Sequence, residues 1–172
     1  KINESILDIL PELLKFSQVI HQTGVNNFES VKLRAGIVLE NSSFPLRYHA
    51  FNFLDEDTIS NAYAAADLII TRASGSIFEI AAVGIPAIVI PLPGSAQDHQ
   101  RENAYAYARA GAAEVLEQEN LTPHLFLDRI RGLLNDKSRR EKMAQSAKNF
   151  SKPDAADRIA DEIIKLTIAH AV

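Results

Sequence analysis

The sequence of 172 residues contains no cysteine and no long hydrophobic run. The absence of cysteine excludes disulfide bonds, thiolate metal sites and cysteine nucleophiles, and it is compatible with a cytoplasmic location. Every apolar run is far shorter than the roughly 20 residues that a membrane-spanning helix needs. No signal-peptide pattern is present either.

Positive charge is also scarce, since the net charge is -4 and the isoelectric point is near 5.7. No basic stripe is available to neutralise phosphates, so we expect no nucleic-acid partner. The Gly-rich dinucleotide and ATP fingerprints are absent, and the five histidines lack the spacing of a zinc site. We therefore expect neither a cofactor nor a metal ion.

Hydrophobic residues at 47% and charged residues at 23% are typical of a soluble globular domain. Helical and strand patterns alternate, which predicts an α/β fold with a Rossmann-like parallel sheet and helices on both faces. The predicted strands are residues 19–22, 48–53, 67–71, 87–90 and 113–116. The predicted helices are residues 2–14, 26–35, a segment from Asp55 or Asp57 to Ala66, 77–84, 100–110, 122–134, 137–150 and 154–169.

The chain begins at Lys1, without Met, and enters a helical pattern at once. In an α/β fold such a helix should follow a strand. We therefore expect that a first strand and its turn lie upstream and that the sequence is part of a longer protein.

The most informative segment runs from residue 67 to residue 104. A buried strand is followed by the small-residue turn Ala73-Ser74-Gly75-Ser76 and then by a helix that ends at Gly84. A tight turn into a helix start exposes unpaired N–H groups and the positive end of the helix dipole. This arrangement suits a phosphate or diphosphate.

A polar cluster at residues 97–100 follows the next strand and the Pro/Gly loop of residues 91–96. The carboxyl ends of parallel strands meet at one edge of a sheet, where ligands bind. The turn at residues 73–76 suits an anion, and the cluster at residues 97–100 suits hydroxyl groups. Two such strand ends side by side predict a nucleotide-sugar site.

Each of these features also has a purely structural interpretation. Ser76 and Glu79 match the S-x-x-E capping box, whereas Glu79 could instead accept two hydrogen bonds from ribose hydroxyls. Asp98 could cap a helix, whereas Gln100 could read sugar hydroxyls. His99 could be the general base of a hydrolase, but the sequence has no G-x-S-x-G serine to pair with it.

One segment reads D-x-x-I-x-R, a small turn, E-I-A-A-x-G-x-P-A, then P, D-H-Q-x-x-N-A and A-R-A-G-A-A. This pattern resembles the C-terminal domain of the MurG family. The similarity extends from residues 19–24 through 53–55 to the final helices. It implies the C-terminal half of a two-domain (GT-B type) inverting glycosyltransferase. That family transfers N-acetylglucosamine (GlcNAc) from UDP-GlcNAc to lipid I, making lipid II for peptidoglycan.

The resemblance also implies roles for single residues. Thr23 would lie near the diphosphate, and the backbone of Leu54 would read uracil. Glu79 would bind the ribose, and Gln100, helped by His99, would read the GlcNAc hydroxyls. The turn and helix start around the diphosphate would be formed by Ser74, Gly75, Ser76, Ile77 and Phe78.

The chain departs from the family pattern in two ways. The turn between Arg72 and Glu79 is one residue shorter than the usual family spacing. The N-terminal half, which in the family binds the lipid acceptor and supplies the catalytic histidine, is absent. We therefore assign no catalytic residue and expect the chain to be inactive alone.

This interpretation makes residues 1–172 a UDP-sugar donor-binding domain, with the final helices at about 137–172 packing at its edge. Its partners would be UDP-GlcNAc, its own N-terminal domain and, through that domain, lipid I. The full-length protein would act in the cytoplasm at the inner face of the plasma membrane.

Other functions stay open from the sequence. One is another two-domain sugar-nucleotide enzyme, such as a UDP-GlcNAc 2-epimerase. A second is a stand-alone donor-binding subunit with a membrane partner, as in the eukaryotic dolichol pathway. A flavodoxin-like signalling domain would leave the cluster at residues 98–100 without a role.

Overall fold

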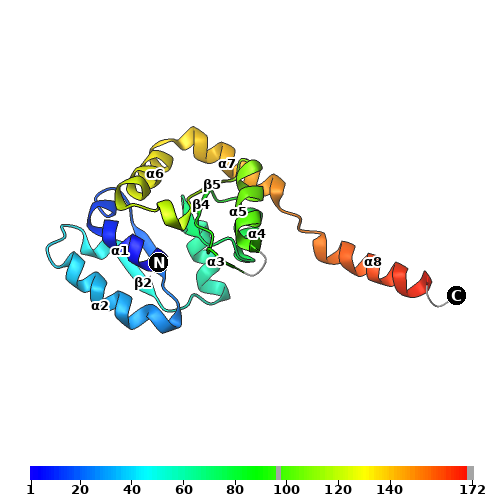
Figure 1. Ribbon diagram of the computed structural model, residues 1–172, viewed down its shortest axis with the longest axis horizontal. Coiled ribbons are helices and arrows are strands. Elements are labelled where there is room, and N and C mark those ends of the chain that lie inside the picture. The colour runs from blue at the N-terminus through cyan, green and yellow to red at the C-terminus, as the bar shows by residue number, and fades with distance from the viewer. Residues whose placement is uncertain (96–97, 170–172) are drawn as a thin grey trace.

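The computed structural model describes residues 1–95 and 98–169, in which helices and strands alternate along the chain (Figure 1). In order, the elements are α1 (Ile2–Leu13), β1 (Val19–Gln22), η1 (Val25–Asn27), α2 (Phe28–Leu39), η2 (Pro45–Arg47), β2 (Tyr48–Phe51), α3 (Glu56–Ala65), β3 (Ile69–Thr71), α4 (Ser76–Val83), β4 (Ala87–Val89), α5 (His99–Arg109), β5 (Ala113–Val115), η4 (Gln118–Asn120), α6 (Pro123–Asn135), α7 (Lys137–Phe150) and α8 (Ala155–Ala169).

All strand pairs of the described residues are parallel, which confirms the predicted fold class. The strands form two sheets, one with the order β1-β2 and one with the order β3-β4-β5. A single sheet was predicted, yet within the described residues no ladder joins β1 to β3. The alternating pattern determines strand direction, but it does not determine which strands are hydrogen-bonded neighbours.

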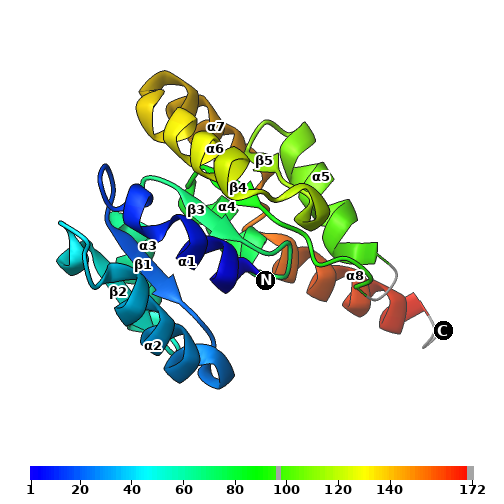
Figure 2. The same ribbon diagram turned by 60° about the vertical axis from the view of Figure 1, so that its left-hand side comes forward.

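The core has two parts because side chains alternate across the faces of β4. Ile88 packs on one face with α1 and with Phe126 of α6. Ala87 and Val89 pack on the other face with Ile77 of α4 and with α5. Figure 2 shows α1 lying across the molecule, in contact with α2 and α6. Helices therefore cover both faces, as predicted.

Several helix boundaries follow from capping chemistry. Asp55 accepts a hydrogen bond from Thr58 N–H at 2.9 Å and so caps α3, which settles the choice between Asp55 and Asp57. Thr122 caps α6 in the same way, with proline in the first turn. Gly84 ends α4 with φ of 80°, a conformation that favours glycine.

The last two helices behave differently from each other. Helix α7 packs against α4 and α6. Helix α8 follows Pro153 and extends away from the body, with residues 155–167 exposed (Figure 1). It therefore does not pack at the domain edge, where the sequence placed it. Within the described residues, no helix combines the length and the apolarity needed to cross a bilayer.

Candidate functional site

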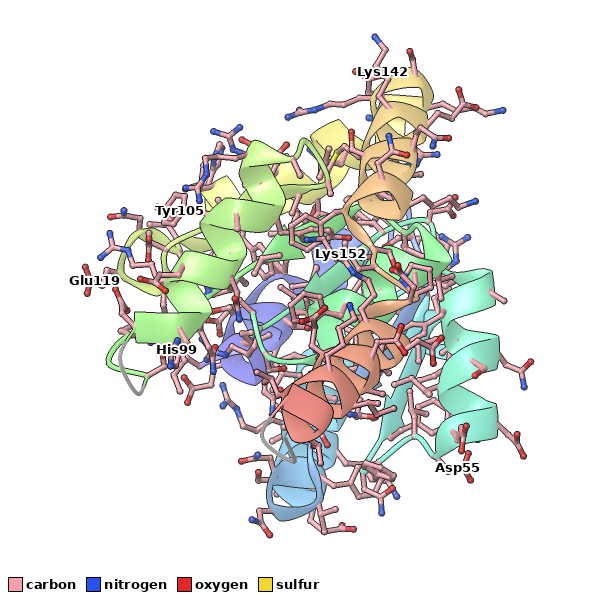
Figure 3. The ribbon with its side chains drawn as sticks, turned by 90° about the vertical axis from the view of Figure 1, so that its right-hand side faces the viewer. Asp55, His99, Tyr105, Glu119, Lys142 and Lys152 are labelled. Carbon is pink, nitrogen blue, oxygen red and sulfur yellow. The ribbon has the colours of Figure 1, made fainter. Side chains whose placement is uncertain are left out.

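The candidate residues lie in the loops and helix starts that follow the strands. Figure 3 labels Asp55 at the start of α3, near the lower right of that view, and His99 at the start of α5, at its left. Lys142 of α7 lies at the opposite, upper edge. Helix α3 follows β2 and α5 follows β4, so Asp55 and His99 come after the carboxyl ends of parallel strands, where ligands of α/β folds bind.

The turn between β3 and α4 presents free backbone donors. The N–H groups of Ser74, Gly75 and Ser76 donate to no acceptor among the described residues. The next two amides, of Ile77 and Phe78, are satisfied by the carbonyls of residues 74 and 75 at 3.2 and 3.1 Å. Three successive free N–H groups at the positive end of a helix are an arrangement that suits an anion.

No capping box is formed at this helix start. Gly75 occupies the N-cap position, and no side chain accepts a hydrogen bond there. The Ser76 hydroxyl instead pairs with the Ser74 hydroxyl at 3.1 Å. The predicted capping role of Ser76 and Glu79 is therefore wrong. The box requires serine one residue before the helix, whereas Ser76 is its first residue.

Two side chains hold this turn against its neighbours. Arg72 donates from Nη1 to the carbonyls of Ile90 and Pro91, both at 3.1 Å, and from Nη2 to Gln118 Oε1 at 2.9 Å. Partial burial lowers the pKa of Arg72. Asn103 of α5 donates to the carbonyl of Ala73 at 3.3 Å. The turn is thereby fixed relative to the end of β4 and the start of α5.

Glu79 lies on the first turn of α4 and is exposed. It faces Tyr63 of α3, whose pKa is raised first by burial and then by the charge of Glu79 and a hydrogen bond to it. Its neighbour Phe78 stacks on Phe150, with ring centroids 6.2 Å apart. These two residues of α4 line an apolar groove that continues to Phe150 and Pro153. The carboxylate is thus open to a ligand, whereas Ile77 is fully buried in the core.

The start of α5 carries the predicted sugar-reading cluster, of which Gln97 lies outside the described residues. Asp98 has φ of 58° and forms no side-chain cap, so the capping interpretation of Asp98 is wrong. His99 is exposed. Gln100 Oε1 accepts the N–H of Leu92 at 3.0 Å, which leaves the amide NH₂ of Gln100 without an acceptor among the described residues.

Thr23 lies at the end of β1 and is buried. Its N–H and its hydroxyl both donate to the carbonyl of Phe51, at 2.9 and 3.1 Å. The hydroxyl is therefore committed to the backbone of β2. The N–H of Gly24, directly after it, has no acceptor among the described residues and is available to an anion.

Leu54 lies in the loop between β2 and α3. Its N–H donates to Gln22 Oε1 at 2.9 Å. A base that uses this N–H must displace Gln22, whereas the carbonyl of Leu54 accepts no hydrogen bond from a described residue. Gln22 is therefore a neighbour of the site that sequence reasoning did not single out.

A buried chain of hydrogen bonds supports the end of β1. His21 Nε2 lies 3.1 Å from Asn3 Oδ1, and Nδ1 lies 2.8 Å from the Tyr48 hydroxyl. Burial lowers the pKa of His21 to about 4, so the ring is neutral at pH 7. Because Asn3 Oδ1 only accepts, Nε2 carries the proton and Tyr48 donates to Nδ1. Asn3 in turn donates to the carbonyl of Thr23 at 2.9 Å.

Sequence reasoning placed the functional loops and missed the residues that hold them. Arg72 and Asn103 both stood in the segment that carried the family resemblance, but neither received a role. The available signal was their polarity, since Arg72 follows an apolar strand directly and Asn103 lies close to the 98–100 cluster. A polar residue at the end of a buried strand usually bonds to neighbouring backbone.

Parallel strands with helices on both faces, and a turn of free N–H groups at one strand end, are typical of the Rossmann-like domains of two-domain enzymes. Residues 1–159 match the model of the family described as "Glycosyltransferase family 28 C-terminal domain". The chain belongs to this family. The expectation of a glycosyltransferase domain is thereby confirmed.

The relatives support the resemblance noted in the sequence. The UDP-N-acetylglucosamine--N-acetylmuramyl-(pentapeptide) pyrophosphoryl-undecaprenol N-acetylglucosamine transferase of Halothermothrix orenii is 38% identical over 148 residues, covering 85% of this chain and 39% of the relative. The crystal structure of Acinetobacter baumannii MurG matches with a TM-score of 0.74 and 29% identity, covering 94% of this chain and 46% of that one.

A UDP-N-acetylglucosamine 2-epimerase structure matches with a TM-score of 0.63 and 22% identity, covering 95% of this chain and 39% of that one. This likeness shows a shared fold. The chain spans less than half the length of the curated relatives it matches, from 39% to 46%.

Proposed function

We propose that this chain is the donor-binding half of an inverting glycosyltransferase that moves GlcNAc from UDP-GlcNAc to lipid I, making lipid II for peptidoglycan. The family match and the names of the relatives support this proposal. The observation that carries it is the turn of residues 74–76 at the start of α4, with three free N–H groups.

This turn would act on the leaving group. Transfer of the sugar leaves negative charge on the diphosphate of UDP. Backbone N–H groups that already point at that charge stabilise it without reorganising during the reaction, and the dipole of α4 adds to their effect. The N–H of Gly24, at the end of β1, could serve the same diphosphate.

The other contacts would bind the ribose, the sugar and the uracil of the donor. Glu79 is exposed on the first turn of α4 and would accept two hydrogen bonds from the ribose hydroxyls. The free amide NH₂ of Gln100, beside the exposed His99, would donate to a GlcNAc hydroxyl. The backbone of Leu54 would bind uracil through its carbonyl, or through its N–H if uracil displaces Gln22 from that N–H.

The acceptor site and the catalytic base would belong to an N-terminal half, as the family resemblance implies. The base is needed to deprotonate the acceptor hydroxyl. The chain alone would then bind the donor weakly and transfer nothing. In the complete enzyme, lipid I would be met at the inner face of the plasma membrane.

A direct test compares UDP-GlcNAc, UDP-glucose and ATP by calorimetry and by NMR of the labelled chain. UDP-GlcNAc should bind most tightly, with its largest amide shifts at residues 74–76. Glu79→Gln should weaken that binding, and Lys142→Glu at the opposite edge serves as the control for a surface charge change. Equal or tighter binding of ATP would refute the proposal.

The same donor chemistry would serve an epimerase or a stand-alone donor-binding subunit. The full-length protein separates these functions. A transferase leaves UDP-GlcNAc unchanged until acceptor is added, whereas an epimerase converts it to the 2-epimer without acceptor. A stand-alone donor-binding subunit would transfer GlcNAc to the acceptor only when a second polypeptide is added.

A further inference from the structure

Helix α2 has apolar residues on two opposite faces. Val31, Ala35 and Leu39 lie one helical turn apart and are buried against the core. Leu33 and Ile37 are 69% and 65% exposed. At about 100° per residue, Leu33 and Ile37 lie opposite Ala35, whereas Glu29, Gly36 and Glu40 lie between that side and the flank of the helix. The outer face of α2 is thus defined by Glu29, Lys32, Leu33, Gly36, Ile37 and Glu40, which line a shallow groove.

Gly36 lies in the interior of this helix, where glycine costs about 1 kcal/mol of stability relative to alanine. A Cβ atom at this position would meet nothing within 4 Å. No contact among the described residues therefore requires a glycine at this position. Close approach of a second helix to the outer face would make use of it.

Two of the three charged residues on this face are placed symmetrically about Gly36. Lys32 precedes it by four residues and Glu40 follows it by four. Neither side chain forms an ion pair with any described residue, although Lys32 lies over the Phe28 ring at 5.6 Å. If two α2 helices cross antiparallel at Gly36, each Lys32 faces Glu40 of the other copy. At a rise of 1.5 Å per residue, both pairs lie about 6 Å from the crossing point.

We propose that the outer face of α2 is the interface of a homodimer, in which two copies pack antiparallel with Gly36 at the two-fold axis. Leu33 and Ile37 would be covered, and two Lys32–Glu40 ion pairs would set the register. Figures 1 and 2 show α2 at an outer edge of the molecule, on the side away from α8. This proposal does not depend on the proposed function. Since a pair of 12-residue helices is a small interface, the dimer should be weak.

Sedimentation velocity of the whole chain, from about 10 µM to about 1 mM, tests the proposal in the range where a small interface associates. Wild type should shift from monomer to dimer. Lys32→Glu and Glu40→Lys should each weaken association about tenfold, because each removes both ion pairs and sets like charges opposite each other. The double variant should regain wild-type association. Lys142→Glu, an equal charge change on α7, should have no effect.

A second substitution separates dimer contacts from folding. Gly36→Ala should raise the melting temperature of the monomer, because alanine is the better helix former. It should weaken the dimer several-fold, because the added methyl group separates the helices. A wild-type chain that stays monomeric at 1 mM, or a double variant no better than the single ones, would overturn the proposal.

Discussion

The buried histidine His21 gives the stability of the fold a specific dependence on pH. Its pKa is about 4 in the folded protein against an ordinary value of 6.5, because burial disfavours the charged ring. The unfolded chain therefore binds a proton more readily between pH 6.5 and pH 4. Above pH 6.5 the ring is neutral in both states and its contribution to stability is complete. As the pH falls through this window, stability is lost, and the difference corresponds to about 3 kcal/mol.

The assay is urea unfolding of wild type and His21→Asn between pH 4 and pH 8. Carboxylates titrate in both proteins, so the difference between the two free energies of unfolding isolates His21. That difference should fall by about 3 kcal/mol as the pH drops from 7 to 4. His49→Asn, at an exposed position of β2 next to β1, is the matched control, because it changes the same side chain without touching the buried ring.

Parallel pH profiles for wild type and His21→Asn would refute this reasoning. If His21→Asn does not fold, NMR titration of the His21 ring in wild type replaces it. A ring that titrates near pH 6.5 in the folded protein would then contradict the prediction, since burial of the ring is what lowers its pKa.

The remaining predictions concern the candidate site. Glu79→Gln should weaken binding of UDP-GlcNAc by about 1–3 kcal/mol in calorimetry and leave the melting temperature unchanged, and the opposite pattern would return Glu79 to a structural role. Gln100→Glu keeps the oxygen that accepts from Leu92 but removes the donor, so affinity for UDP-GlcNAc should fall more than affinity for UDP; equal losses would exclude sugar reading. Arg72→Met should destabilise the domain by about 2–4 kcal/mol in urea unfolding, because three acceptors lose their donor, and a change below 0.5 kcal/mol, about the size of an ordinary surface substitution, would contradict this. Ser76→Ala should change stability by less than about 0.5 kcal/mol, whereas loss of a true N-cap costs about 1 kcal/mol.

The order of helices and strands could be predicted because core positions recur at regular spacing. Helix α7 spans the predicted residues 137–150, and β1 spans the predicted residues 19–22. Helix α2 was predicted as residues 26–35 but runs from Phe28 to Leu39. Its pattern was obscured because Leu33 and Ile37 are apolar on the solvent side, so the apolar residues do not form a single stripe.

The site could be predicted as a set of loops but not as a set of hydrogen bonds. Topology requires that the loops after parallel strands share one edge, and this brings residues 74–76 near the start of α5. The sequence shows that Ser76, Gln100 and Thr23 can donate or accept, but not which partner each one takes. In the structure, Ser74, Leu92 and Phe51 are those partners.

The contrast between backbone and side chains suggests how a donor would be bound. The free N–H groups of residues 74–76 can donate to a diphosphate without breaking any hydrogen bond within the described residues. The hydroxyl of Thr23 and the N–H of Leu54 must instead exchange a protein partner for a ligand, an exchange that contributes little net free energy. Affinity for UDP should therefore come mainly from the turn and the α4 dipole. A uracil contact through the N–H of Leu54 would replace its hydrogen bond to Gln22, and so would act mainly by rejecting ligands that cannot restore that bond.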